Sequence, residues 1–227
     1  MTTIETQLQT VLDRMAAACR MAGRSATEVG LLAVSKTFPA TAVAEAFRAG
    51  QRAFGENYIQ EGVEKIAALR DLPIEWHCIG PIQSNKTRLV AEHFDWVHTV
   101  DRLKIAQRLS EQRPSDKAPL QVCIQVNVDA GENKSGVSPA DALALAQQVA
   151  LLPGLRLRGL MCIPEPAPDF VAACAVLTRV RALFDALNKE GLDLDTVSMG
   201  MSADLEAAIQ AGSTLVRVGS AIFGGRS

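Results

Sequence analysis

Short apolar runs alternate with longer segments of helical period along this chain of 227 residues. The apolar runs are rich in β-branched residues and have the length of buried strands. They predict eight strands, at residues 31–35, 52–55, 76–80, 96–100, 122–128, 157–163, 196–199 and 215–218. Between these runs, apolar residues recur every three or four positions, as they do on the buried face of an amphipathic helix.

The predicted helices are recognised by the apolar positions that each would bury. These positions are Val43 and Phe47; Ile59, Val63 and Ile66; Leu103, Ala106 and Leu109; Leu143, Ala146 and Val149; and Phe170, Leu177, Phe184 and Leu187. A further amphipathic helix precedes the first strand and carries Leu8, Val11, Leu12, Met15 and Cys19.

Continuous apolar strands joined by helices indicate a parallel sheet that is covered on its outer face. About eight such units in roughly 250 residues is the size of a closed (β/α)8 barrel. We therefore predict an α/β fold, a single TIM-type barrel domain over residues 1–227 with an extra N-terminal helix. A doubly wound open sheet is the competing architecture. It is disfavoured because the first strand leads into Lys36-Thr37-Phe38-Pro39 and not into a G-x-G-x-x-G turn.

Composition and charge narrow the class of protein further. Hydrophobic residues make up 48% of the chain and charged residues 21%, which indicates a globular protein. The net charge is −2 without long runs of either sign, so we expect neither a nucleic-acid nor a membrane partner. The N-terminus lacks a secretory signal, and we expect a cytoplasmic protein. Because no large apolar helix face is left over, we also expect a monomer.

Cysteine and histidine provide no obvious metal site or disulfide framework. The five cysteines are odd in number and lack C-x-x-C spacing. Cys78, Cys123 and Cys162 lie in apolar runs, where reduced cysteine behaves as a small hydrophobic residue. The three histidines have no partner at i,i+4 with a supporting acid.

Lys36 is the most informative candidate for chemistry. It directly follows the first predicted strand and precedes a proline-containing break. An ammonium group at the mouth of a buried strand loses hydration, so its pKa can fall and its neutral amine can attack a carbonyl. Lys36 is therefore a candidate Schiff-base lysine. The alternative is a lysine at a strand end that simply reaches solvent.

The segments after the seventh and eighth strands are candidates for anion binding, because phosphate commonly binds there in TIM barrels. Ser202 is predicted to be the N-cap of the helix that follows, and Gly200 would let the backbone approach a ligand closely. Gly219 and Ser220 offer a second set of N–H groups and a hydroxyl. The alternative is an ordinary helix cap that is satisfied internally.

Arg217 is unusual because it lies between two valines in the last strand, and a buried guanidinium needs an acceptor. It could pair with a carboxylate such as Glu56, or it could point into the barrel mouth and donate to a ligand. Taken with Lys36 and the two anion-binding segments, the second option describes a ligand with an aldehyde, a phosphate and a ring nitrogen. Pyridoxal 5'-phosphate (PLP) has these three groups.

Several long motifs carry a family resemblance that runs from about residue 5 to the C-terminus. They are Ala33-Val34-Ser35-Lys36-Thr37, Phe54-Gly55-Glu56-Asn57-Tyr58, residues 77–86 (HCIGPIQSNK), Gln125-Val126-Asn127-Val128, Leu160-Met161, Ser198-Met199-Gly200-Met201-Ser202 and Val216-Arg217-Val218-Gly219-Ser220. In these motifs the chain resembles the pyridoxal phosphate homeostasis proteins, a family similar in fold to the N-terminal barrel of alanine racemase.

The resemblance implies that Lys36 forms the PLP aldimine, that Arg217 faces the pyridine nitrogen, and that Asn57 lines the cofactor. It also implies that Ser202, Gly219 and Ser220 bind the phosphate. Ser220 stands where threonine is common in the family, which preserves the hydroxyl. Pro81-Ile82 replaces a pair that usually contains leucine.

Four more residues are secondary candidates. Lys86 and Lys134 are either solvated charges or lysines that handle cofactor entering or leaving the site. We expect Tyr58 to begin a helix and His77 to be a hydrogen-bonded histidine near the mouth.

The function expected is a non-catalytic PLP carrier or buffer in vitamin B6 homeostasis, with PLP-dependent apo-enzymes as partners. One alternative is a PLP-dependent amino-acid racemase, and another is a class I aldolase that uses Lys36. Racemisation needs acid/base groups on both faces of the carbanion. Tyr58 is the one tyrosine of the sequence and is expected beside Lys36, and the chain ends directly after the barrel. At most feeble racemase activity is therefore expected.

Overall fold

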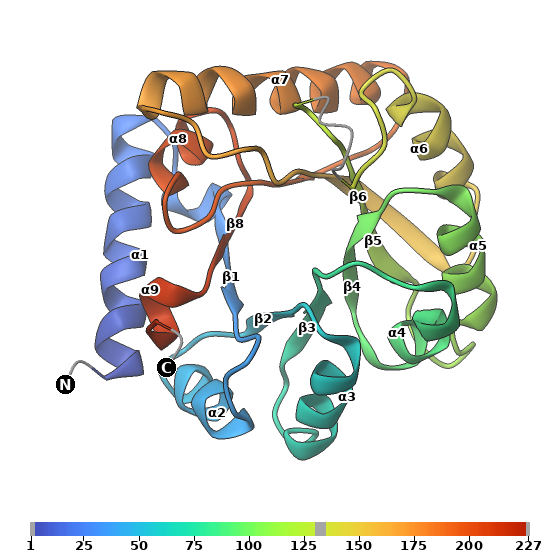
Figure 1. Cartoon of the computed structure of the whole chain (residues 1–227), viewed down its shortest axis with the longest axis horizontal. Helices are drawn as coiled ribbons and strands as arrows, with labels where there is room; N and C mark the ends of the chain where they lie inside the picture. Colours follow the sequence, from blue (N-terminus) through green and yellow to red (C-terminus); the bar gives the residue numbers. More distant parts are fainter. Residues whose placement is uncertain (1–2, 130–134, 226–227) are drawn as a thin grey trace.

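The computed structural model describes residues 3–129 and 135–225, and within them the strands form one closed parallel barrel in sequence order. The ring is seen in Figure 1. The strands are β1 (Gly30–Val34), β2 (Ala53–Glu56), β3 (Glu75–Cys78), β4 (Trp96–Val100), β5 (Leu120–Gln125), β6 (Leu155–Met161), β7 (Thr196–Ser198) and β8 (Leu215–Val218). The pairing of β1 with β8 closes the barrel, with Leu32 opposite Arg217.

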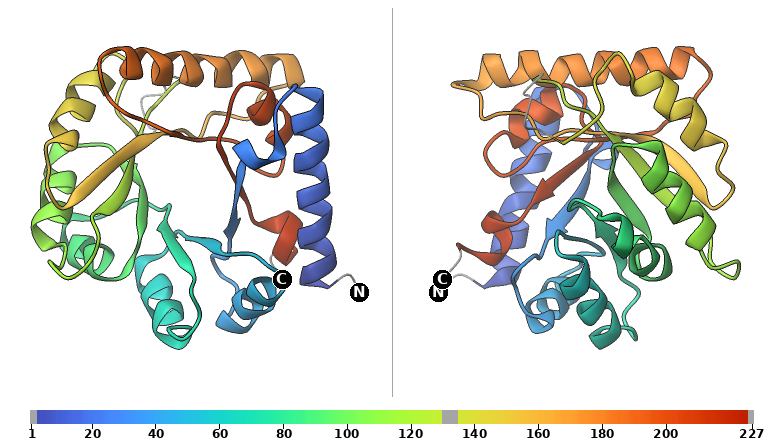
Figure 2. Two further views of the ribbon diagram at one scale, coloured as in Figure 1. Left: turned by 180° about the vertical axis from the view of Figure 1, so that it is seen from behind. Right: turned by 45° about the vertical axis from the view of Figure 1, so that its right-hand side comes forward.

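Helices surround the strands on the outside, as the two views of Figure 2 show. The α-helices are α1 (Ile4–Met21), α2 (Ala40–Arg48), α3 (Ile59–Ala68), α4 (Thr87–His93), α5 (Leu103–Gln112), α6 (Ala142–Ala150), α7 (Phe170–Lys189), α8 (Leu205–Gln210) and α9 (Ser220–Phe223). Two 3-10 turns, η1 (Ala26–Glu28) and η2 (Ser84–Lys86), complete the described elements. The N-terminal helix α1 packs against α8 and α9 and so covers the last strands of the barrel.

The main hydrophobic core lies between the sheet and the helices, and smaller clusters fill the barrel itself. One inner cluster contains Leu32, Val34 and Ile79, and another contains Trp96, Cys123 and Met161. The interior also holds buried polar side chains, which need hydrogen-bond partners within the protein.

The predicted barrel is confirmed, and all eight predicted strands are present with ends that shift by up to three residues. Two apolar positions were assigned wrongly to buried faces. Leu12 is 38% exposed on α1 and Phe170 is 53% exposed at the start of α7. Both belong to helices with other apolar residues better placed toward the core, since Met15 and Leu177 are buried.

Cys78, Cys123 and Cys162 are buried, as predicted, and all five cysteines are free. Burial raises the pKa values of Cys78 and Cys123 to about 12, so both remain thiols. A search of the described residues finds no helix long and apolar enough to cross a membrane.

Gly159 provides a test of the barrel packing. A Cβ atom at this position would lie 1.7 Å from the Thr196 carbonyl oxygen on the neighbouring strand. We expect Gly159→Ala to lower the free energy of unfolding by about 1 to 3 kcal/mol in urea titrations, because the backbone of one of the two strands must shift to make room for the methyl group. The control is Gly225→Ala, where a Cβ would meet nothing within 4 Å. Equal stability of the two variants would contradict this packing.

Candidate functional site

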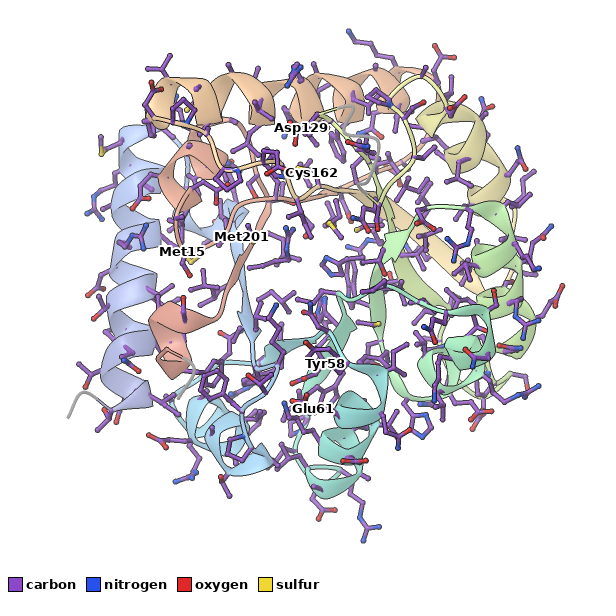
Figure 3. All side chains as sticks on the ribbon, viewed as in Figure 1. Met15, Tyr58, Glu61, Asp129, Cys162 and Met201 are labelled. Carbon is purple, nitrogen blue, oxygen red and sulfur yellow. The ribbon has the colours of Figure 1, made fainter. Side chains whose placement is uncertain are left out.

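A cavity of about 380 Å³ opens where the carboxyl ends of the strands meet. Small-molecule sites usually measure about 300 to 1,000 Å³. The cavity is lined by six residues predicted from the sequence: Lys36, Asn57, Ser202, Arg217, Gly219 and Ser220. They come from β1, β2, β7 and β8 or from the segments directly after these strands. In Figure 3, Cys162 and Met201, after β6 and β7, lie across the ring from Tyr58 and Glu61.

Lys36 lies in the turn between β1 and α2, and hydrogen bonds hold this turn on both sides. Thr37 has a φ of 67°, a left-handed conformation that is strained for a β-branched residue. Its backbone N–H donates to Glu61 Oε1 at 2.7 Å. On the other side, the Ser35 carbonyl accepts from Lys65 Nζ at 2.7 Å. The backbone is therefore fixed immediately before and after Lys36, whose side chain lines the cavity.

A buried ion pair between α3 and the sheet supports this turn. Lys65 Nζ lies 2.8 Å from Glu56 Oε1 and 2.6 Å from Glu61 Oε1. Ser35 Oγ donates to the same Glu56 oxygen at 2.6 Å. Burial raises the pKa of Glu56, while the hydrogen bonds from Lys65 and Ser35 act in the opposite direction. Lys65 is thus a structural cation, and Lys36 is the one lysine among the described residues that line the cavity.

Arg217 is buried, and the proposed pairing with Glu56 is wrong because Glu56 pairs with Lys65. One terminal nitrogen of Arg217 donates to the carbonyl and the hydroxyl of Ser198, both at 2.7 Å. The other donates to the Cys162 carbonyl at 2.8 Å. Burial lowers the pKa of Arg217, yet a guanidinium stays charged in proteins.

The Nε–H of Arg217 is the donor that remains for a ligand. It makes no hydrogen bond to a residue within the described ranges, and Arg217 lines the cavity. A guanidinium can only donate, so this group suits an acceptor such as an unprotonated ring nitrogen.

The prediction that Ser202 caps the helix after β7 is wrong. The helix α8 begins at Leu205, and its N-cap is Asp204, whose Oδ1 accepts from the Met201 N–H at 2.6 Å. Ser202 lies too far ahead of the first turn to reach its N–H groups. Its hydroxyl makes no hydrogen bond with another residue in the described part of the chain, and Ser202 lines the cavity.

The turn after β7 requires glycine at position 200. The φ of Gly200 is 95°, and a Cβ there would lie 2.3 Å from Ala208 Cβ on α8. The turn is also held from the N-terminal helix, because Arg14 donates to the Ser202 carbonyl at 3.0 Å and pairs with Glu206 at 2.6 Å. The role of Arg14 was not predicted from the sequence. Arg14 and Ser202 are 188 positions apart, so their contact leaves no local sequence pattern.

The segment after β8 contributes further groups that can hold an anion. The helix α9 begins at Ser220, so its first N–H groups have no acceptor within the helix. Gly219 lets the backbone lie close to β1, because a Cβ there would be 3.0 Å from the Val34 carbonyl oxygen. The Ser220 hydroxyl has no hydrogen bond to any other described residue. With Ser202, this end of the cavity fits a phosphate.

Asn57 provides a buried acceptor on the opposite wall. Its Oδ1 has no hydrogen-bond partner among the described residues. Buried polar atoms are rarely left unpaired, so a ligand donor or a water is expected there. Gly80 fixes the neighbouring backbone, since a Cβ at this position would lie 1.9 Å from the Asn57 carbonyl oxygen.

The secondary candidates lie elsewhere. Lys86 ends η2 and is not among the described residues that line the cavity. Tyr58 precedes α3, as predicted, and is 55% exposed. His77 is hydrogen-bonded at both ring nitrogens, but it lies inside the barrel on β3 and not at the mouth. Lys134 falls outside the described residues.

The cavity therefore combines an amine, a donor for a ring acceptor, and hydroxyl and N–H groups for an anion. These groups fit pyridoxal phosphate, which has an aldehyde, a pyridine nitrogen and a phosphate. No group of three or more potential metal ligands is found among the described residues.

Comparisons with known proteins agree with this chemistry. Residues 10–227 match a family model described as the alanine racemase N-terminal domain. The chain is 60% identical over 226 residues to the pyridoxal phosphate homeostasis protein of Pseudomonas aeruginosa, which covers 100% of this chain and 97% of that protein. It is 54% identical over 229 residues to the protein of the same name from Escherichia coli, covering 100% and 98%.

Among solved structures, the chain is similar to PipY from Synechococcus elongatus. The structure without PLP has a TM-score of 0.87 at 37% identity and covers 98% of this chain and 100% of that one. The structure with PLP bound has a TM-score of 0.81 at 38% identity and covers 92% and 100%.

The buried ion pair beneath the Lys36 turn generates a stability prediction. Lys65→Met leaves the Glu56 carboxylate buried without its cation, and we expect a loss of about 3 to 5 kcal/mol in urea unfolding. The double variant Glu56→Gln/Lys65→Met should lose less, because it contains no unpaired buried charge. Lys104→Met, at an exposed position on α5, is the control. Equal stabilities of Lys65→Met and Lys104→Met would contradict the structural role of Lys65.

Proposed function

The chain belongs to the pyridoxal phosphate homeostasis protein family, and we propose that it holds PLP in the mouth of its barrel as a Schiff base on Lys36. In this role it contributes to intracellular PLP homeostasis as a carrier or buffer. The observation that carries the proposal is the meeting of Lys36, Arg217, Ser202 and Ser220 around one cavity, although they come from opposite ends of the sequence.

The attachment step needs only the Lys36 amine and the aldehyde of PLP. The neutral Nζ attacks the carbonyl carbon, a C=N bond forms, and the carbonyl oxygen leaves as water. Addition of water to the C=N bond reverses the step and releases the cofactor. A reversible bond of this kind suits storage and delivery, and we propose PLP-dependent apo-enzymes as the recipients.

The other groups orient the cofactor. Arg217 Nε–H donates to the pyridine nitrogen, while Ser202, Gly219 and Ser220 hold the phosphate, and Asn57 lines the ring. Since a guanidinium cannot accept a proton, the pyridine nitrogen stays unprotonated and the cofactor is a weak electron sink.

The lining of the cavity favours a carrier over a racemase. Inversion of an α-carbon needs acid/base groups on both faces of the carbanion. Among the described lining residues, Lys36 is the one amine that could serve as an acid/base group. Tyr58 is largely exposed and is not part of that lining. The monomeric state and the cytoplasmic location stay predictions.

Visible absorbance tests the attachment directly. The protein mixed with PLP should develop an absorption band of a Schiff base that borohydride bleaches, because the reductant converts C=N to an amine. Lys36→Ala should lack this band, and Lys86→Ala, a lysine change outside the cavity, should keep it. An unchanged band in Lys36→Ala would show that another amine holds the cofactor.

The phosphate contacts are tested with two serine variants. Replacing Ser202 or Ser220 by alanine removes one charge-assisted hydrogen bond, so PLP binding should weaken by about 1.5 to 3 kcal/mol in equilibrium titrations. Binding of unphosphorylated pyridoxal should hardly change. Equal losses for both ligands would place the phosphate elsewhere.

Proton exchange separates the carrier from the racemase alternative. L-alanine incubated with the PLP-loaded protein in deuterated buffer should exchange its α-proton slowly or not at all, without formation of D-alanine. NMR and chiral chromatography follow the two outcomes. Conversion to D-alanine at the median enzymatic rate of about 10 per second would favour the racemase.

A further inference from the structure

A continuous chain of hydrogen bonds crosses the barrel interior and ends at Arg217. Glu75 Oε1 lies 2.8 Å from His77 Nε2, and His77 Nδ1 lies 2.8 Å from His98 Nε2. His98 Nδ1 lies 2.9 Å from Ser198 Oγ, which accepts from Arg217 at 2.7 Å. We call these five residues the interior chain.

The interior chain joins the two ends of the barrel. Glu75 is the first residue of β3, at the amino end of the strands, and its side chain is 51% exposed. His77, His98 and Ser198 are 1%, 0% and 0% exposed, so the middle of the chain is shielded from solvent. Arg217 lines the cavity at the carboxyl end. Strands β3, β4, β7 and β8 thus each contribute a link.

The two ends give this chain one direction. Arg217 can only donate, so Ser198 Oγ accepts from it, and the serine proton is available for His98 Nδ1. Glu75 as a carboxylate can only accept, so it takes the Nε2 proton of His77. With both imidazoles neutral, His77 Nδ1 is then an acceptor, and His98 donates from Nε2 and accepts at Nδ1. Every link therefore donates toward Glu75.

The charges of the end groups support the same direction. The acceptors that Arg217 contacts are two carbonyls and one hydroxyl, all of them neutral. Along the interior chain, the first anion is Glu75. The hydrogen bond from His77 lowers the pKa of Glu75, which keeps it ionised, and burial lowers the pKa of His98 well below its usual range. With the reverse direction, His98 would point an N–H toward the guanidinium.

We propose that Glu75, His77, His98 and Ser198 are positioning residues that act through Arg217. Their polarised chain holds one terminal nitrogen of the guanidinium inward, the Cys162 carbonyl holds the other, and Nε–H is left directed at the ring nitrogen of the bound ligand. The inference rests on the proposed function, because it assigns that N–H to pyridoxal phosphate.

The direction of the chain is measured without any ligand. The sequence has three histidines, and His93→Gln removes the one outside the interior chain. In ¹⁵N NMR of this histidine-labelled variant at pH 8, His77 and His98 should each carry a proton on Nε2 and a bare Nδ1. A proton on Nδ1 of His98 would overturn the proposed direction.

Variants of Glu75 test whether its carboxylate sets the direction of the hydrogen bonds in the interior chain. Glu75→Gln keeps an acceptor carbonyl and should preserve both tautomers, while Glu75→Ala should give His98 a detectable Nδ1-protonated population. Glu92→Ala is the matched control, because Glu92 is a surface carboxylate paired with Arg88 outside the chain. Unchanged His98 signals in Glu75→Ala would overturn the role of Glu75.

The action on the ligand is tested with PLP and its 1-deaza analogue, which has C–H in place of the ring nitrogen. We expect Ser198→Ala to weaken PLP binding about tenfold and to leave binding of the analogue nearly unchanged. Ser198→Thr, which keeps the hydroxyl, should restore most of the affinity for PLP. Equal losses for both ligands would show that Ser198 only supports the fold and would overturn the inference.

The two kinds of failure are distinguishable. If the unmodified protein does not bind PLP, the proposed function is wrong. The role assigned to Arg217 Nε–H is then wrong as well. If the unmodified protein binds PLP but the Ser198 variants do not discriminate between the ligands, the proposed function stands and the positioning role is wrong.

Discussion

The site depends on one constraint, the burial of cations in places that water does not reach. Lys65 and Arg217 are both almost fully buried, and each needs acceptors within the protein. Lys65 obtains them directly from Glu56, Glu61 and the Ser35 carbonyl. Arg217 obtains neutral acceptors and is connected to a carboxylate only through Ser198 and two histidines. The first supports the turn that carries Lys36, and the second lies in the lining of the cavity.

The turn that carries Lys36 is held by Lys65 and its neighbour Glu61. The ion pair of Lys65 fixes the backbone on both sides of Lys36, and the strained Thr37 shows that the turn is held against its local preference. Arg217 lies on β8, the strand that pairs with β1. Closing the barrel therefore brings the first and last strands together, and with them the amine and the guanidinium.

The sequence predicted the barrel and five of the six lining residues from local or repeating signals, while Asn57 came from the family resemblance. Strand periodicity identifies β1 to β8, and the carboxyl ends of the strands identify the mouth. Ser202 was assigned to the cavity for a wrong reason, since the cap is Asp204. The difference of two residues cannot be read from composition, because serine and aspartate are both good N-caps.

Contacts over long sequence separations were not predictable. Arg14 reaches the segment after β7 from the first helix, and Ser198 contacts His98 from 100 positions away. His77 was expected near the mouth because its motif continues into the segment after β3. The strand alternation instead places it inside the barrel, where it is one link among buried polar groups.

The identity of the attached lysine decides whether the cavity is the place where the cofactor is held. The PLP-loaded protein is reduced with borohydride, digested, and mapped by mass spectrometry. The account predicts that the pyridoxyl group is found on the peptide that contains Lys36. Its recovery mainly on Lys86, Lys134 or another lysine would contradict the account, because the cavity would then not be the place where the cofactor is held.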